Sequence, residues 1–225
     1  MSSFDDFLEV ADRDGALAET RARALASRRR LLGLAGGGLA LALAGPGRAG
    51  AAPSKTDVDI LNYALVLEYL QASFYTEAEE GGALFGKTAQ AARVVGAVER
   101  AHVKAFREVL GSSAVRRPLF DFQGTTERQD QFLKTAVALE DLAVAAYKGQ
   151  APRLKSKKVL AAAIGIHSVE ARHAAWMRAL FGITPAVHSF DQPMSRPAIS
   201  KIVASTRFIA SRPRMQSSRR PKYTG

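Results

Sequence analysis

The chain has 225 residues, of which 47% are apolar and 24% charged, so it can bury one core and is too apolar for a disordered protein. It contains no cysteine, which excludes disulfides, thiolate metal sites and a cysteine nucleophile, so a bound metal must rest on Glu, Asp and His. The formal net charge is +11, and its distribution along the chain decides whether it indicates a nucleic-acid surface.

Residues 1–51 are predicted to be an export signal. Ser27-Arg28-Arg29-Arg30-Leu31-Leu32 leads into 14 mostly apolar residues, 31–44, and these end before the small-residue site Ala49-Gly50-Ala51. The apolar stretch is short, because a helix that spans a bilayer needs about 20 apolar residues. The paired arginines resemble the signal of the twin-arginine pathway, which exports folded proteins. We therefore expect an exported bacterial protein, periplasmic or at the cell surface, with the twin-arginine machinery as a partner. An ordinary signal peptide or an uncleaved anchor is the alternative.

Residues 52–182 are predicted to form an all-α domain. Apolar residues recur there every three or four positions, and no run alternates with the period of two that a strand needs. Breaks rich in glycine divide the segment into four helices, at about 56–80, 87–110, 126–149 and 156–181. Helices of similar length joined by short, long and short connections predict a four-helix bundle of two hairpins, with a crossover at 112–125.

Residues 183–225 are expected to form an irregular basic tail. This segment has eight basic residues and one acidic residue, whereas residues 52–182 have 17 basic and 14 acidic residues. The positive charge is therefore gathered at one end and not on the folded body. We expect no nucleic-acid partner, since an exported protein meets little nucleic acid. A weak contact of the tail with an anionic membrane stays open, and the sequence leaves the oligomeric state unknown.

Two of the predicted helices carry the pattern Glu-x-x-His. Glu99 and His102 lie on the second helix, and Glu170 and His173 lie on the fourth, 71 residues further along. Residues three positions apart are neighbours on a helix surface. Each pattern can therefore deliver a carboxylate and an imidazole to the same point.

The other two helices each place one glutamate in an otherwise apolar stretch. These are Glu68 and Glu140, which are 72 residues apart, so the second half of the bundle repeats the first in register. A tyrosine repeats as well, because Tyr75 and Tyr147 each follow their glutamate by seven residues, two turns along the same face. We expect these tyrosines to be core residues with a hydrogen-bond partner rather than redox relays. His167 is a candidate for a supporting group near the site or an ordinary histidine.

Four glutamates and two histidines that converge inside a bundle need compensation. Buried carboxylates repel one another, and each has a desolvation cost of several kcal/mol. Two divalent cations would balance four negative charges. Oxygen ligands with imidazole suit iron or manganese, and the lack of sulfur argues against copper(I) or an iron–sulfur cluster. We therefore expect two Fe or Mn ions, held by Glu68, Glu99, His102, Glu140, Glu170 and His173.

The segments around these six residues, 62–75, 99–103, 139–147 and 168–175, resemble the helices of the ferritin-like domain family that includes the plant desiccation-related proteins. The likeness covers about residues 56 to 190, and all six ligand positions are filled at the expected spacing. The resemblance implies a ferritin-like fold and a dinuclear site. It settles no substrate, since the biochemical activity of the family is poorly defined.

Two functions from different classes are compatible with such a centre. The first is an exported oxidoreductase that acts on O₂ or peroxide in oxidative or desiccation stress, with a catalase-like version if the metal is manganese. The second is a non-catalytic stress-related protein whose metal ions are structural and neutralise the core. Turnover of peroxide or O₂ by the metal-loaded protein distinguishes the two.

Overall fold

A computed structural model describes residues 53–186 and 188–210 of the chain. The predicted export signal, 1–51, lies outside the described residues, and so does the end of the basic tail, 211–225. In the part of the chain that is described, no helix is both long and apolar enough to cross a membrane.

The described part is helical, as the apolar periodicity predicts. The four long helices are α4 (Lys55–Gly81), α5 (Gly86–Leu110), α6 (Gln129–Gln150) and α7 (Lys157–Phe181). Short 3₁₀ helices, η1 (Gly111–Ser113) and η2 (Ala151–Arg153), follow α5 and α6. A further helix, α8 (Arg196–Thr206), and two short strands, β1 (Leu119–Phe120) and β2 (Ile209–Ala210), complete the fold.

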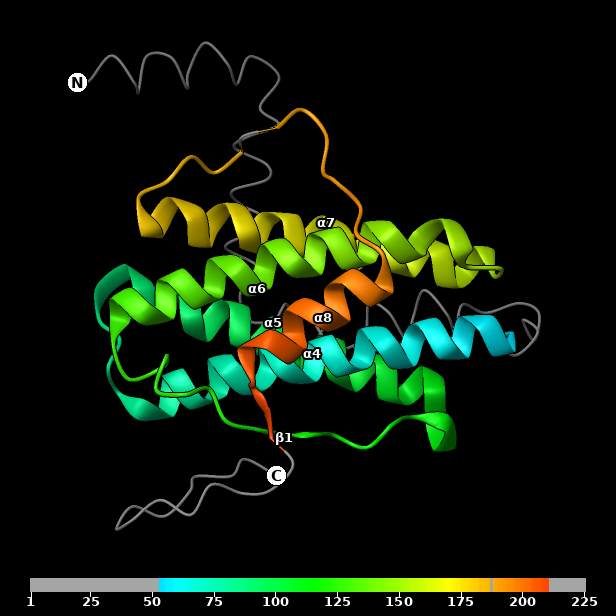
Figure 1. Cartoon of the computed structure of the whole chain (residues 1–225), viewed down its shortest axis with the longest axis horizontal. Helices are drawn as coiled ribbons and strands as arrows, with labels where there is room; N and C mark the ends of the chain where they lie inside the picture. The colour runs from blue at the N-terminus through cyan, green and yellow to red at the C-terminus, as the bar shows by residue number, and fades with distance from the viewer. Residues whose placement is uncertain (1–52, 187, 211–225) are drawn as a thin grey trace, which may run out of the picture.

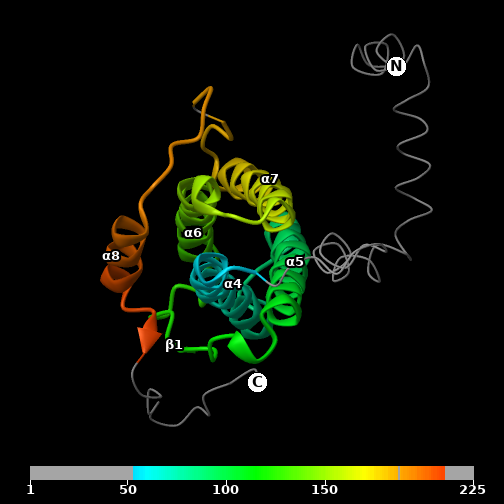
Figure 2. The ribbon, with the colours of Figure 1, turned by 90° about the vertical axis from the view of Figure 1, so that its right-hand side faces the viewer.

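The four long helices form a bundle of two hairpins. Helix α4 packs along α5, and α6 packs along α7. The hairpins meet through contacts of α4 with α6 and of α5 with α7, and the end-on view in Figure 2 shows the four helices around a common centre. The all-α bundle with a long crossover between its hairpins is confirmed (Figure 1).

The crossover between α5 and α6 is longer than predicted by three residues at its end. The backbone N–H of Thr125 donates to the carbonyl of Phe122 at 3.0 Å, and that of Glu127 donates to the carbonyl of Gly124 at 3.0 Å. These turns keep the chain out of a helix until residue 129. Strand β1 of the crossover pairs antiparallel with β2, so the crossover is tied to the tail.

The tail is not wholly irregular, which corrects that expectation for the described residues. Ser195 caps α8, because its hydroxyl accepts from the N–H of Ala198 at 3.4 Å, and a proline follows in the first turn. Buried Ile199 and Val203 pack into the core of the bundle, and Phe208 meets Phe122 edge-on at 5.4 Å between ring centroids. These contacts with the crossover and the bundle fix a segment whose own sequence is weakly helical.

Gly149 on α6 permits the close approach of this tail segment. The N–H of Met194 donates to the carbonyl of Ala145 at 3.0 Å, which brings the backbone of residue 194 against α6. A Cβ atom at position 149 would lie 1.9 Å from the carbonyl oxygen of Met194. Any side chain at this position would therefore displace the segment that leads into α8.

Asp57 joins the start of α4 to the start of α7. Its backbone N–H donates to Ser54 Oγ, and the N–H of Ser54 donates back to Asp57 Oδ2, which forms a capping box. The same buried carboxylate also accepts from the N–H groups of Lys155 at 2.7 Å and Ser156 at 3.2 Å. Burial by itself raises the pKa of Asp57, but these hydrogen bonds outweigh it and lower the pKa below its usual value.

Asp57→Ala should lower the free energy of unfolding by about 2–4 kcal/mol at neutral pH, because it leaves the N–H groups of two helix starts without an acceptor. A lowered pKa means that this stability is present above the unfolded-state pKa of about 3.9 and is lost as the pH falls through the folded-state pKa. Denaturant unfolding at about pH 7 and about pH 3 measures both effects. The control is Asp59→Ala, which removes an exposed carboxylate from the same helix. Equal losses in the two variants would contradict the role given to Asp57.

Candidate metal centre

Each long helix places its predicted ligands on the face that points into the bundle. The four carboxylates, Glu68, Glu99, Glu140 and Glu170, are completely buried, and His102 and His173 are 8% and 5% exposed. The apolar neighbours of each glutamate turn its face inward, since residues three and four positions away on the same helix pack in the core. The structure thus brings all six predicted residues to one place.

The six residues form two overlapping groups. One group consists of Glu68, Glu99, His102 and Glu170, and the other of Glu99, Glu140, Glu170 and His173; within each group the ligand atoms lie within 4.8 Å of one another. Glu99 and Glu170 belong to both groups. Two ions in these groups would share Glu99 and Glu170, and one further glutamate and one histidine would help to hold each ion.

Both histidines direct Nδ1 toward the carboxylates. His102 Nδ1 lies 3.1 Å from Glu68 Oε2 and 3.2 Å from Glu170 Oε1. His173 Nδ1 lies 2.8 Å from Glu99 Oε1 and 3.6 Å from Glu140 Oε2. Each imidazole therefore contacts carboxylates from two other helices, and these carboxylates belong to the same group as the histidine.

Several of these buried atoms make no hydrogen bond of proper geometry within the described residues. They are both carboxylate oxygens of Glu99, one oxygen each of Glu140 and Glu170, and His173 Nδ1. Buried polar atoms are almost always satisfied, because an unsatisfied one costs about 1–3 kcal/mol. Atoms that converge without bonding one another are what a shared cation would coordinate. The residues present therefore fit a dinuclear metal centre.

The pKa values of the cluster are displaced in the way that crowded charges require. Burial raises the pKa of Glu68 to about 7, although the positive charge of His102 opposes the shift. Burial, with the charge of Glu99, also raises the pKa of Glu140 and Glu170. These three groups hold a proton more readily than an exposed glutamate does. Burial disfavours their charged form, and the positive charge of the histidines does not offset this effect for all three.

The pKa values of Glu99 and of the two histidines shift in the direction opposite to the one that burial favours. Burial favours the neutral form of Glu99, but contacts with His102 and His173 outweigh it and lower its pKa to about 2. Burial also favours neutral imidazoles, yet Glu140 and Glu99 raise the pKa of His173 to about 10. The pKa of His102 lies well above its usual value for the same reason. The cluster thus demands positive charge, which divalent cations can supply.

Two tyrosines support the outer glutamates across the bundle. The hydroxyl of Tyr75 on α4 donates to Glu140 Oε1 on α6 at 2.6 Å. The hydroxyl of Tyr147 on α6 donates to Glu68 Oε1 on α4. The prediction of core tyrosines with a hydrogen-bond partner is confirmed. Each bond fixes one carboxylate oxygen and leaves the other directed at the histidine of its group.

Gln71 is a residue of the site that the spacing argument missed. Its side-chain Nε2 donates to Glu170 Oε2 at 3.3 Å, and the residue is buried. It follows Glu68 by three positions, the same spacing that links each Glu-x-x-His pair. A buried amide at this spacing was therefore the available signal. The equivalent residue of the second half is Ala143, so the repeat is not symmetric here.

The remaining histidines do not join the six residues. His167 Nε2 lies 3.8 Å from Asp191 Oδ2 in the tail, and His188 is exposed. None of the contacts recorded within the described residues links His167 to a member of the two groups. The supporting role considered for His167 therefore has no structural counterpart here.

The sequence model of one protein family, described as a ferritin-like domain, matches residues 56–182, which is more than half of the chain. No curated protein matches the sequence. The matched segment contains α5, α6 and α7 entire, almost all of α4, and the six residues of the two groups.

Proposed function

The chain belongs to the ferritin-like domain family, and on that premise we propose that it is an exported dinuclear-metal carboxylate protein that acts as an oxidoreductase on O₂ or peroxide. The observation that supports this proposal is the pair of buried groups that share Glu99 and Glu170. Ions of iron or manganese held there would supply electrons and Lewis acidity for the two-electron reduction of O₂ or peroxide.

The chain's own residues would hold and seal this chemistry. Glu99 and Glu170 would help to hold both ions, and His102 and His173 would each help to hold one of them. The hydroxyls of Tyr75 and Tyr147 keep the outer glutamates in place. Because all four carboxylates are fully buried, bulk water is kept from the centre, and electrostatic interactions within it are strong.

We also propose a cellular location for the protein, on the basis of its sequence alone. The arginine pair at 28–29, the weakly apolar stretch and the small-residue site favour export through the twin-arginine machinery to the periplasm or cell surface. A metal centre assembled inside a bundle suits a pathway that carries folded proteins. The division into signal (1–51), bundle (52–182) and basic tail (183–225) belongs to the same proposal, as does a desiccation-related stress role.

The test of the oxidoreductase is consumption of substrate by the metal-loaded protein. With iron or manganese bound, the protein should consume peroxide, or O₂ with a reductant, as measured with an oxygen electrode and a peroxide assay. Glu108→Ala is an exposed substitution on α5 that removes a long contact with Lys104, and this variant should consume substrate at the same rate. Full metal occupancy without consumption of either substrate would overturn the oxidoreductase and favour the structural alternative.

A further inference from the structure

An apolar cavity lies at one end of the candidate metal centre, among all four long helices. The residues that line it are mainly aliphatic and aromatic and include Ile60, Ala64, Phe106, Tyr147, Ala163 and Ile166. Cavities lined in this way stay dry and accept apolar molecules.

The cavity begins one helical turn from the metal-ligand positions. Ala64 precedes Glu68 by four residues, Ile166 precedes Glu170 by four, and Phe106 follows His102 by four. One turn is about 5.4 Å along the axis. Tyr147 makes the connection direct, since this residue lines the cavity and its hydroxyl donates to Glu68. The side chain of Tyr147 alone would therefore separate a molecule bound in the cavity from the carboxylate of Glu68.

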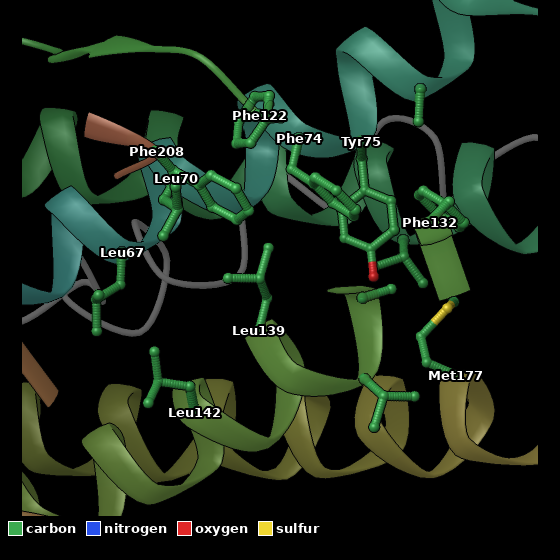
Figure 3. Packing of buried hydrophobic residues seen from close by; sticks show 14 of the residues in the cluster. Leu67, Leu70, Phe74, Tyr75, Phe122, Phe132, Leu139, Leu142, Met177 and Phe208 are labelled. Atoms are coloured by element: carbon green, nitrogen blue, oxygen red, sulfur yellow. The ribbon is translucent and has the colours of Figure 1, made fainter. Parts of the chain in front are cut away.

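The internal repeat shows how the other end of the centre differs at a position equivalent to one in the cavity lining. Phe132 lies 72 residues after Ile60 and so occupies the equivalent position at the other end. Its ring stacks on Phe74 at 5.1 Å and meets Tyr75 edge-on at 5.7 Å between centroids, and all three rings are completely buried. Figure 3 shows the side chains of Phe74, Tyr75 and Phe132 close together. Aromatic packing thus fills the Tyr75 end, whereas the Tyr147 end has the cavity.

The length and lining of the cavity define what it can take. Ile60 and Leu67 both line it and lie seven residues apart on α4, which is about 10 Å. Tyr63, also in the lining, has a buried hydroxyl without a hydrogen-bond partner among the described residues. No lysine, arginine, aspartate or glutamate lines the cavity. An elongated apolar molecule with at most one neutral polar group matches these features, and a charged one does not, because burying an unpaired charge is costly.

We propose that the cavity between Ile60 and Tyr147 is the binding site for an uncharged, elongated apolar molecule, which it places next to the Glu68 side of the metal centre. As a co-substrate site this inference rests on the proposed function, but the binding itself does not. The closing experiment therefore measures binding and proximity, neither of which requires turnover.

The experiment titrates straight-chain primary alcohols, from butanol to octanol, into the full chain by calorimetry. Affinity should rise about fourfold for each added methylene until the cavity is filled. Octanoate should bind at least about tenfold more weakly than octanol, since its carboxylate finds no partner. A flat affinity along the series, or octanoate binding as tightly as octanol, would overturn the proposal.

Ala163→Phe tests the location, because this partly buried residue lines the cavity and a phenyl ring would fill it. The variant should lose at least about tenfold in octanol affinity. Ala161→Phe adds the same group to the exposed face of α7 and should bind octanol as the parent chain does. If Ala163→Phe fails to fold, Leu154→Phe at another lining position replaces it. Unchanged affinity in a folded cavity-filling variant would overturn the assignment.

Proximity to the centre is tested with manganese-loaded protein, because a paramagnetic ion nearby broadens the proton resonances of bound octanol. Broadening in the parent chain that disappears in Ala163→Phe would support the placement. Binding without broadening at full occupancy would contradict it. Failure to consume peroxide or O₂ would overturn the proposed function alone and would leave the binding result standing.

Discussion

Replacing Glu99 and Glu170 together with alanine should reduce the metal content from two ions per chain to none. These two residues are the ones that both groups share, so their loss takes two carboxylates from each metal position. What remains for each ion is one glutamate and one histidine, too few ligands for a stable site of iron or manganese. Metal analysis of protein purified from its native compartment measures the change.

The outer glutamates give a graded version of the same experiment. Glu68 belongs to the first group alone and Glu140 to the second alone. Glu68→Ala or Glu140→Ala should therefore lower the content by about one ion, with the other position retained. A combined Glu108→Ala and Glu127→Ala variant removes two exposed carboxylates and should keep both ions. Full occupancy in the Glu99→Ala, Glu170→Ala protein would refute the ligand assignment.

The fold could be predicted from the sequence because the four long helices carry strong local signals. Apolar periodicity and glycine breaks place α4, α5, α6 and α7, and their limits are right to within about three residues. Helix α8 was not predicted, although Ser195 followed by Pro197 is a helix-start signal. What stabilises it is packing against α6 and the core of the bundle, which the sequence of the tail does not reveal.

The candidate site was predictable to the extent that it repeats. The spacing of 71 or 72 residues singles out six positions. The same residue types are unlikely to recur at nearly the same spacing unless the second half of the bundle repeats the first. The departures from the repeat were not predicted. In the repeat, Gln71 corresponds to Ala143 and Ile60 corresponds to Phe132. The first difference adds a hydrogen bond to Glu170, and the second changes the packing around the centre. Side-chain volume at such positions decides where the cavity lies, which spacing alone does not determine.

Glu140→Gln should change stability in opposite directions depending on the metal. The glutamine keeps an acceptor for the Tyr75 hydroxyl but removes a carboxylate that burial and the charge of Glu99 disfavour. Without metal, the variant should be about 1–3 kcal/mol more stable than the parent chain. With iron or manganese bound, it should be less stable by a similar amount, because a neutral amide binds the cation weakly and less binding energy is gained on folding.

Denaturant unfolding with a chelator and with saturating manganese gives the four free energies of unfolding that are needed. Glu108→Gln, which neutralises an exposed glutamate, should leave stability nearly unchanged in both conditions. The reversal of sign follows from electrostatics: a carboxylate enclosed by hydrocarbon and by other carboxylates destabilises the fold until a cation neutralises it. If Glu140→Gln were destabilising in both conditions by the same amount, the carboxylate would be a structural hydrogen-bond partner of Tyr75, and the cation would not be needed to explain its place in the core.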